Sequence, residues 1–378
     1  MTRYRDLGLT VGQMSPGPLN AITDVEPVRV GVTTLIEGEG ALHVGEGPVR
    51  TGVTVIVPHD GIGREVLFAG CHRLNGNGEL TGLEWIREAG MLTTPVAITN
   101  THSVGVVRDA LVAAEMSQRE DANAYWSLPV VGETYDGTLN DMDGFHVKPE
   151  HVMAALDAAA SGPVPEGNVG GGTGMICHEF KGGTGTASRR LPAEAGGWTV
   201  GALVQANYGT RERLTVDGVP VGRELNTDVI ASPFDDSLPG GVVTQPGSGS
   251  IIVILATDAP LLSHQCERIA QRAGLGIARV GGAGEPSSGD IFLAFSTANR
   301  GKLTSYKHGD DRRAFDVTML PDAALGDLFW AAIEATEEAI LNALIGAQTM
   351  TGRDGITVNA LDHAQLVDVM GRYGRGPA

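Results

Sequence analysis

Cysteine, aromatic residues and positive charge are all scarce in this chain. The three cysteines, Cys71, Cys177 and Cys266, lie far apart and form no Cys-x-x-Cys pair, so neither a disulfide framework nor a zinc ribbon is indicated. Reduced cysteines are typical of the cytoplasm, which is the expected location. The sequence starts without the apolar run of a signal peptide. No stretch reaches the ~18 apolar residues of a membrane span, so a membrane is not an expected partner.

Positive charge is too sparse for the usual partners that carry phosphate. Lys and Arg number 27 against 45 for Asp and Glu, which gives a formal net charge of −18. A nucleic-acid binder needs a cationic face to displace counterions from phosphates, and an anionic membrane surface would repel such a chain. The charge balance therefore argues against nucleic acid as a partner and favours a substrate that carries positive charge.

Glycine is the abundant residue instead. The chain has 54 Gly in 378 residues, about twice the usual share of roughly 7%. Low-complexity disorder would also reduce the apolar fraction, but 42% of the residues are hydrophobic. We therefore expect the glycines to serve tight turns and close backbone approaches in a folded α/β protein.

Hydrophobic periodicity predicts strands and helices that alternate in blocks. The expected strands are 28–36, 52–57, 65–69, 95–98, 198–206, 250–256 and 291–295. The expected helices are 80–89, 103–119, 149–160, 259–274, 323–347 and 361–373. The acidic residues of the longest helix, Glu334, Glu337 and Glu338, are expected on a solvated face. Together the patterns predict one layered catalytic domain over 1–378, of the α/β or α+β class.

Ser250 stands at an unusual junction. A Gly- and Pro-rich loop over 237–249 ends at Gly249, and Ser250 then opens a fully apolar strand. Serine is a weak nucleophile that needs an adjacent base. If the Gly249–Ser250 bond were cut, Ser250 would gain an α-amino group with a pKa near ~7.7–8.0, which can accept a proton at neutral pH. Taken alone, the pattern also fits a serine that simply follows a turn and begins a strand.

Nine collinear segments give this junction a wider context, because together they resemble the DmpA-like self-processing aminopeptidases of peptidase family S58. That family includes L-aminopeptidase D-amidase/esterases and β-peptidyl aminopeptidases. The segments cover most of the chain, which makes the resemblance far more specific than one motif. They are GPLNAITDV (17–25), VGVTTL (30–35), ITNTHSVGVVRDA (98–110), VVGETYDGTLND (130–141), GNVGGGTGM (167–175), FKGGTGTASR (180–189), VQANYG (204–209), GSGSIIVILATDAPL (247–261) and SSGDIFLAFSTAN (287–299).

The resemblance implies a role for particular residues. The precursor would cleave itself before Ser250 into chains 1–249 and 250–378, and Ser250 would then be the catalytic nucleophile. Its new amino group would be the general base, helped by Ser288. Asn207 looks like the family's side-chain oxyanion donor, although Asn-Tyr-Gly is also good turn sequence. Glu133 resembles the acidic residue that binds the substrate's free ammonium group, although a plain loop carboxylate fits the same pattern.

Ser288 and Asp290 form a pair in the segment SSGD. In the family this pair is associated with hydrogen bonds that orient the nucleophile, with Glu where this chain has Asp290. Because aspartate is one methylene shorter, its direct reach to Ser250 is in question, and an ordinary Ser-Gly-Asp turn is the alternative.

The resemblance also implies an architecture and a class of substrate. The expected fold is a four-layer αββα sandwich that looks like the N-terminal nucleophile hydrolases but differs in connectivity. The expected assembly is a homo-oligomer of processed heterodimers, commonly a tetramer. The expected substrates are small peptides, amino-acid amides or esters with a free amino group, attacked without a cofactor. Whether L-, D- or β-amino acids are preferred stays open.

Two other functions and a metal site are the alternatives to this interpretation. Ornithine acetyltransferases share the self-cleaving logic but use threonine as nucleophile. A nucleotide-binding protein could use the loop Gly170–Gly174, although the usual phosphate-loop signatures are incomplete here. A metal site could be suspected at Asp141, Asp143, His146 and His151, but their spacing matches neither HExxH nor an EF-hand. We expect solvated loop residues there and assign no metal.

Overall fold

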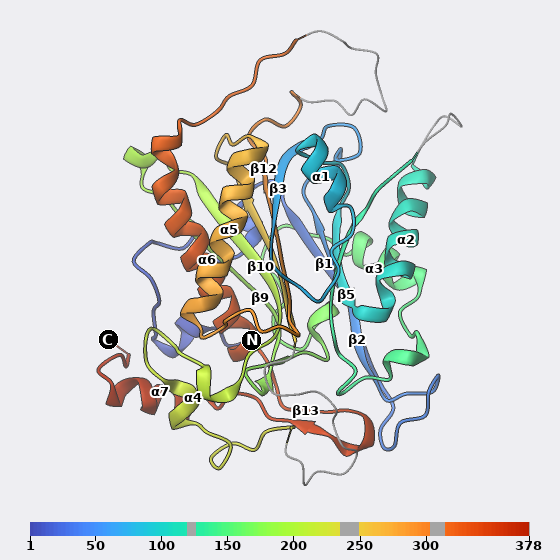
Figure 1. Cartoon of the computed structure of the whole chain (residues 1–378), viewed down its shortest axis with the longest axis vertical. Helices are drawn as coiled ribbons and strands as arrows, with labels where there is room; N and C mark the ends of the chain where they lie inside the picture. The colour runs from blue at the N-terminus through green and yellow to red at the C-terminus, as the bar shows by residue number, and fades with distance from the viewer. Residues whose placement is uncertain (119–125, 235–248, 303–313, 378) are drawn as a thin grey trace.

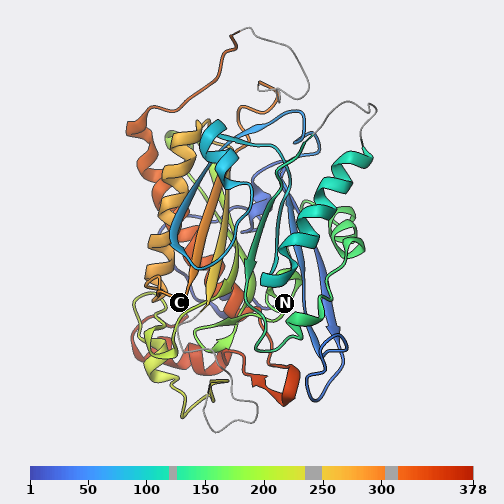
Figure 2. The same cartoon turned by 45° about the vertical axis from the view of Figure 1, so that its right-hand side comes forward.

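The computed structural model describes residues 1–118, 126–234, 249–302 and 314–377. Two β-sheets lie face to face at its centre, and a pair of long helices covers each outer face (Figures 1 and 2). This arrangement confirms the predicted four-layer αββα sandwich. Most of the predicted loop over 237–249 lies outside the described residues, and only Gly249 of it is seen. None of the helices in the described ranges is both long enough and apolar enough to cross a membrane.

The smaller sheet has four strands. Their order across the sheet is β1 (Arg29–Glu37), β2 (Val49–Val57), β5 (Val96–Asn100) and β6 (Val130–Thr134). Helices α2 (Val104–Ser117) and α3 (Pro149–Asp157) pack on its outer face. Strands β5 and β6 run parallel, so their carboxyl ends, which carry Asn100 and Thr134, meet at one edge of the sheet.

The larger sheet has six strands, and its central strands are almost entirely apolar. The order of the six strands is β4 (Met91–Leu92), β3 (Leu67–Gly76), β12 (Gly289–Ser296), β11 (Ser250–Thr257), β10 (Thr199–Asn207) and β9 (Gly183–Arg190). Helices α5 (Ser263–Arg279) and α6 (Leu325–Ile345) cover its outer face. The remaining helices with α-helical geometry are α1 (Leu83–Ala89), α4 (Val221–Glu224) and α7 (His363–Arg372).

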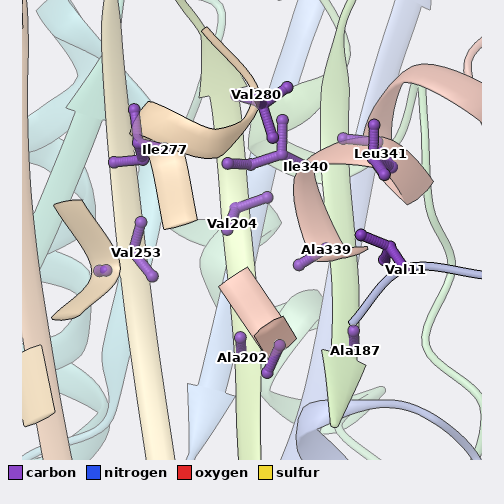
Figure 3. Packing of buried hydrophobic residues seen from close by; sticks show 14 of the residues in the cluster. Val11, Ala187, Ala202, Val204, Val253, Ile277, Val280, Ala339, Ile340 and Leu341 are labelled. Atoms are coloured by element: carbon purple, nitrogen blue, oxygen red, sulfur yellow. The ribbon is translucent and has the colours of Figure 1, made fainter. Parts of the chain in front are cut away.

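Strand β11 shows how the layers are held together. Its residues alternate in direction because side chains of a strand point to opposite faces. Val253 and Leu255 join the core beneath α5 and α6, which Figure 3 shows around Val204 and Ile340. Ile252 and Ile254 instead join the core between the two sheets. A strand buried on both faces reads as a continuous apolar run, which is why the sequence predicted it.

Two of the strands that were not predicted, β9 and β6, share a reason. Strand β9 reads GTGTASRR and strand β6 reads VVGET, so both mix small and polar residues that resemble loop sequence. In β9 the small size is required by packing. A Cβ atom on Gly185 would lie only 2.0 Å from the Ala339 carbonyl oxygen of α6, so glycine lets that helix approach the sheet.

The prediction of a solvated acidic face on α6 is wrong. Glu334, Glu337 and Glu338 are all buried. Glu338 Oε2 accepts a hydrogen bond from Arg189 Nη2 at 2.7 Å, and its Oε1 accepts one from Arg5 Nε at 2.8 Å. Burial alone would raise the pKa of Glu338, but the two guanidinium groups hold it below its usual range. The carboxylates are therefore internal partners of arginine, which charge periodicity cannot reveal.

The buried pair predicts a large stability effect. Replacing Glu338 by Ala removes one of the two carboxylates that contact Arg189, whose side chain is fully buried, and leaves only Glu334 at 3.1 Å. Breaking one side of a buried ion pair costs about 3–5 kcal/mol, so we expect E338A to lower the free energy of unfolding by about that amount in urea titrations. Glu84 pairs with Arg87 on the surface, and the control E84A should change the same quantity by less than about 0.5 kcal/mol. Equal effects of the two variants would contradict the assignment.

Candidate active site

Ser250 lies at the end of the larger sheet, between two strands that both carry predicted site residues. It is the first residue of β11 and pairs with Asn207, the last residue of the antiparallel strand β10. On its other side it pairs with Gly289, the first residue of the parallel strand β12. The Gly289 amide donates a hydrogen bond to Ser250 Oγ at 3.0 Å. Strand pairing thus brings together residues that are far apart in the sequence.

Gly249 has a backbone conformation that suits glycine. Its φ is +155°, in a range that residues with a Cβ atom seldom adopt. A Cβ atom there would lie 2.0 Å from the Asn207 carbonyl oxygen. Both the dihedral angle and the available space therefore require glycine immediately before Ser250.

The Asn207 amide is held at both ends by backbone groups. Its Oδ1 accepts a hydrogen bond from the Ile176 amide at 2.7 Å, and its Nδ2 donates one to the Tyr135 carbonyl at 3.0 Å. If the amide were flipped, its NH2 group would face the Ile176 N–H and its oxygen would face the Tyr135 carbonyl, and neither pair could form a hydrogen bond. The hydrogen bonds therefore determine the orientation of the Asn207 amide. Among the described residues Nδ2 has one acceptor, so its second hydrogen remains available, and Asn207 lines the cavity described below.

Glu133 reaches the same place from the smaller sheet. It is the fourth residue of β6 and only 3% exposed. Its Oε1 accepts a hydrogen bond from the Glu79 amide at 2.9 Å, and its Oε2 accepts one from the Thr101 hydroxyl. Burial raises the pKa of Glu133, while these hydrogen bonds act in the opposite direction. A cation placed beside this carboxylate would compensate for its lost hydration.

Ser288 and Asp290 lie on either side of Gly289, and both are buried. Ser288 Oγ donates a hydrogen bond to Asp290 Oδ1 at 2.6 Å. Burial raises the pKa of Asp290 to about 6, against the opposing effect of this bond. Within the described part of the chain, Ser250 Oγ bonds to the Gly289 amide and to neither of these side chains. In this structure Asp290 therefore bonds to Ser288 and not to the Ser250 hydroxyl.

A cavity of about 390 Å³ opens in front of these groups. Ser250, Asn207 and Glu133 all line it, whereas Ser288 and Asp290 do not. Its other walls combine acidic and polar side chains with apolar ones, including Glu79, Thr101, Thr138, Tyr135, Ile176 and Phe234. A larger hollow of about 800 Å³ lies beside α2 and α3, but no predicted site residue lines it. The smaller cavity is therefore the candidate active site.

Several groups that contact Ser250 or line this cavity were not predicted from the sequence. The Gly289 amide carries no side-chain signal, although glycine at the start of a buried strand could have indicated a close backbone approach. Thr101 and Tyr135 lie inside the segments that carry the family resemblance. A threonine or a tyrosine in such a segment does not by itself indicate a role in a binding site. Their roles follow from contacts between the two sheets, which no short-range pattern encodes.

The glycine loop proposed for nucleotides is filled by the protein's own groups. The Gly170 amide donates to Thr34 Oγ1 at 2.8 Å, and the Gly171 amide donates to Thr54 Oγ1 at 3.1 Å. A phosphate loop needs such amides free to point at the anion. The loop therefore has a packing role, and the nucleotide-binding alternative does not hold.

The suspected acidic and histidine cluster is only partly solvated. Asp141 is buried, so the expectation of an exposed loop carboxylate is wrong for it. Its Oδ2 contacts His146 Nε2 at 2.8 Å and accepts the Gly45 amide at 2.8 Å, which explains its burial. Asp143 stays largely exposed and contacts His102. In the described ranges no three His, Cys, Asp or Glu side chains gather as a metal site requires.

Comparison with known families identifies relatives over nearly the full chain. The model of peptidase family S58 matches residues 20–358. The beta-peptidyl aminopeptidase BapA of Sphingosinicella microcystinivorans is 49% identical over 99% of this chain and 93% of its own length. The corresponding enzyme of Sphingosinicella xenopeptidilytica is 43% identical over 97% of this chain and 90% of its own length.

Solved structures agree with the sequence comparison. A Burkholderia beta-aminopeptidase superimposes with a TM-score of 0.90 at 55% identity, covering 99% of both chains. The L-aminopeptidase D-Ala-esterase/amidase of Ochrobactrum anthropi superimposes with a TM-score of 0.86 at 46% identity, covering 100% of this chain and 99% of its own. That structure is described as a prototype for the serine aminopeptidases and a new variant among the Ntn hydrolase fold.

The raised pKa of Asp290 predicts a pH-dependent stability. A carboxyl group that titrates at about 6 when folded and near ~3.9 when unfolded binds its proton more tightly in the folded state. Its contribution to stability is therefore greatest at low pH and is lost as the pH rises from about 4 to about 6.5. Over that window we expect wild type to lose up to about 3 kcal/mol of unfolding free energy relative to D290N.

The measurement is urea unfolding of both proteins at several pH values between 4 and 8. D290N keeps an acceptor for the Ser288 hydroxyl, so it is a matched reference. Parallel pH profiles for the two proteins would show that Asp290 titrates normally in the fold.

Proposed function

The chain belongs to peptidase family S58 and is a serine aminopeptidase, and on that premise we propose that it activates itself by cleavage between Gly249 and Ser250. The observation that carries the proposal is the position of Ser250. Its hydroxyl lines the cavity, its backbone nitrogen belongs to the Gly249 peptide bond, and Asn207 lies directly opposite. Among the hydroxyl-bearing residues that line the cavity, Ser250 is the one that directly follows Gly249 and pairs with Asn207 across neighbouring strands.

Self-cleavage proceeds in two balanced steps. Ser250 Oγ attacks the Gly249 carbonyl carbon, the C–N bond breaks, and the proton lost by the hydroxyl goes to the departing nitrogen. Water then hydrolyses the resulting ester, which frees the Gly249 carboxylate and restores the Ser250 hydroxyl. The positive φ of Gly249 exposes this carbonyl to attack without interference from a side chain. The products are chains 1–249 and 250–378, which stay associated.

The same hydroxyl then acts on substrate. The α-amino group of Ser250, with a pKa near ~7.7–8.0 in its free form, takes the proton from Oγ as that atom attacks the substrate carbonyl. The free Nδ2 hydrogen of Asn207 stabilises the oxyanion, a contact worth about 2.7–4 kcal/mol in a dry site. The ammonium returns its proton to the leaving amine, and water hydrolyses the acyl-enzyme.

Ser288 and Asp290 act from behind the nucleophile. We assign Ser288 a supporting role in proton transfer to the α-amino group, because its neighbour Gly289 pairs directly with Ser250. Asp290 accepts a hydrogen bond from the Ser288 hydroxyl and so orients Ser288. In this chain the aspartate thus acts through Ser288 and needs no contact with Ser250.

Glu133 makes the enzyme an aminopeptidase by binding the free amine of the substrate. A charge-assisted hydrogen bond to this carboxylate selects a protonated amino terminus over a blocked one. Glu79 on the same cavity wall adds negative charge. The substrates are small peptides, amides or esters with a free amino group. Residues with a β-amino group are included, since two relatives are named beta-peptidyl aminopeptidases.

The assembly and the location are further parts of the proposal. We propose a tetramer-like homo-oligomer of processed heterodimers, as the family resemblance implies. We also propose a cytoplasmic location. The three cysteines are all buried and unpaired, which suits a reducing compartment.

The cleavage proposal is tested by intact-mass analysis of freshly purified protein. Wild type should give two fragments corresponding to 1–249 and 250–378, and S250A should give one uncut chain because it lacks the attacking hydroxyl. Ser287 lines the same cavity, so S287A is the matched control and should be cut like wild type. Active wild-type protein with an intact Gly249–Ser250 bond would overturn the proposal.

The role of Glu133 predicts a change in selectivity. Hydrogen bonds to charged groups contribute about 1.5–3 kcal/mol, so E133Q should lower kcat/KM for an amino-acid amide with a free amine by about 10- to 100-fold. The rate with the N-acetylated analogue should stay unchanged, so the ratio between the two substrates falls. E79Q, an exposed charge on the same wall, should change the ratio by less than about 3-fold. An unchanged ratio in E133Q would remove Glu133 from amine recognition.

A further inference from the structure

One peptide group connects a buried lysine to the Asn207 amide. Lys181 Nζ donates a hydrogen bond to the Met175 carbonyl at 2.7 Å. The amide nitrogen of that same peptide unit belongs to Ile176, and it donates to Asn207 Oδ1 at 2.7 Å. The chain of contacts therefore runs from the lysine nitrogen through the 175–176 peptide to the side-chain amide beside Ser250. Hydrogen bonds arranged in such a series polarise one another.

The direction of polarisation favours oxyanion binding. A positive donor on the Met175 oxygen draws electron density toward that oxygen, which makes the Ile176 N–H a stronger donor. A stronger bond to Asn207 Oδ1 polarises the Asn207 amide in turn and increases the partial positive charge on its Nδ2 hydrogens. One of these hydrogens is fixed to the Tyr135 carbonyl. The other is the group that our proposed mechanism directs at the oxyanion.

Lys181 contacts the Met175 carbonyl and has no contact with solvent. Its side chain is fully buried, and a second hydrogen bond runs from Nζ to the Gly182 carbonyl at 2.9 Å. Burial lowers the pKa of Lys181 to about 7, while Cys177 and Asp136 act in the opposite direction. The amine keeps N–H donors in either protonation state. Burying a lysine amine that contacts only carbonyl groups among the described residues costs free energy. We therefore expect this lysine to have a role that offsets the cost.

The hairpin that carries this peptide is rigidly held. Strands β7 (Ile176–Cys177) and β8 (Phe180–Lys181) pair so that Ile176 lies opposite Lys181. The two turn residues, His178 and Glu179, both have positive φ, as a type I′ hairpin turn requires. Non-glycine residues adopt this conformation only when their surroundings impose it.

Two side chains impose that conformation on the turn. Glu179 accepts the Arg211 amide at 2.9 Å and the Ser232 hydroxyl at 2.7 Å. Arg211 Nη2 in turn donates to the Glu179 carbonyl at 2.9 Å. The position of the 175–176 peptide is therefore fixed before substrate binds, which is the condition for electrostatic preorganisation.

We propose that Lys181 is a positioning residue for the oxyanion site, acting on Asn207 through the Met175–Ile176 peptide. The proposal rests on the proposed role of Asn207 as oxyanion donor. Cooperative strengthening of ~10–30% per bond, applied to a donor whose loss costs ~10²–10³-fold in kcat, corresponds to about 2- to 8-fold in kcat.

The test is a double-mutant cycle on processed enzyme with an amino-acid amide as substrate. K181M should lower kcat by about 2- to 8-fold while KM stays unchanged, because only the transition state carries the oxyanion. N207A alone should lower kcat by ~10²–10³-fold. In the N207A background K181M should have no further effect on kcat, since the group through which it acts is gone.

Two further variants separate positioning from folding. Thr173 is buried in the same glycine-rich turn and donates to the Gly170 carbonyl at 2.6 Å, but it does not contact the 175–176 peptide. T173V should lower Tm and leave kcat unchanged. If K181M fails to fold or mature, K181Q replaces it in the cycle, because glutamine keeps a neutral N–H at that position.

The outcomes distinguish the two proposals. An unchanged kcat in N207A would remove Asn207 from oxyanion binding and so overturn the proposed function. A normal effect of N207A with a lysine variant that keeps wild-type kcat would overturn the inference alone. So would a lysine effect that persists undiminished in the N207A background, because it would show a route that does not pass through Asn207.

Discussion

The pairing of three strand ends is the constraint from which the active site is built. Ser250 begins β11 directly beside the last residue of β10 and the first residue of β12. A shift of one residue in either pairing would turn the Ser250 side chain to the opposite face of the sheet. The apolar residues of β11, buried on both faces, hold the register. The position of Ser250, the proposed nucleophile, is thus a consequence of core packing around β11.

The smaller sheet contributes the carboxylate of Glu133 and a backbone carbonyl to the site that the larger sheet begins. Glu133 comes from β6, and its carboxylate is held by groups that follow β3 and β5. The backbone after β6 also accepts the Asn207 amide through the Tyr135 carbonyl. The proposed recognition of the amine and the proposed stabilisation of the oxyanion therefore both depend on the distance between the sheets. The small residues at this interface, such as Gly132 packed against Ile252, keep that distance short.

The sequence allowed the layers to be predicted because their strongest signals are local. An apolar run such as 250–256 and the helix over 323–347 are visible in any short window, and the family resemblance supplied the order of layers and the candidate residues Ser250, Asn207 and Glu133. The burial of Glu338 was not predictable, because its partners Arg5 and Arg189 are distant in sequence. The same reason hid the Gly289 amide and Lys181, whose contacts arise only when the strands and the hairpin have assembled.

The strand order has a consequence for the two chains that cleavage would produce. In the larger sheet β11 and β12 lie between β3 and β10, so the shorter polypeptide is inserted between two parts of the longer one. Neither piece has a complete hydrophobic core of its own, because residues from both share the two largest core clusters. Scission would therefore release a terminus but create no dissociable subunits. The nicked molecule would melt as a single cooperative unit, and dilution would not separate it.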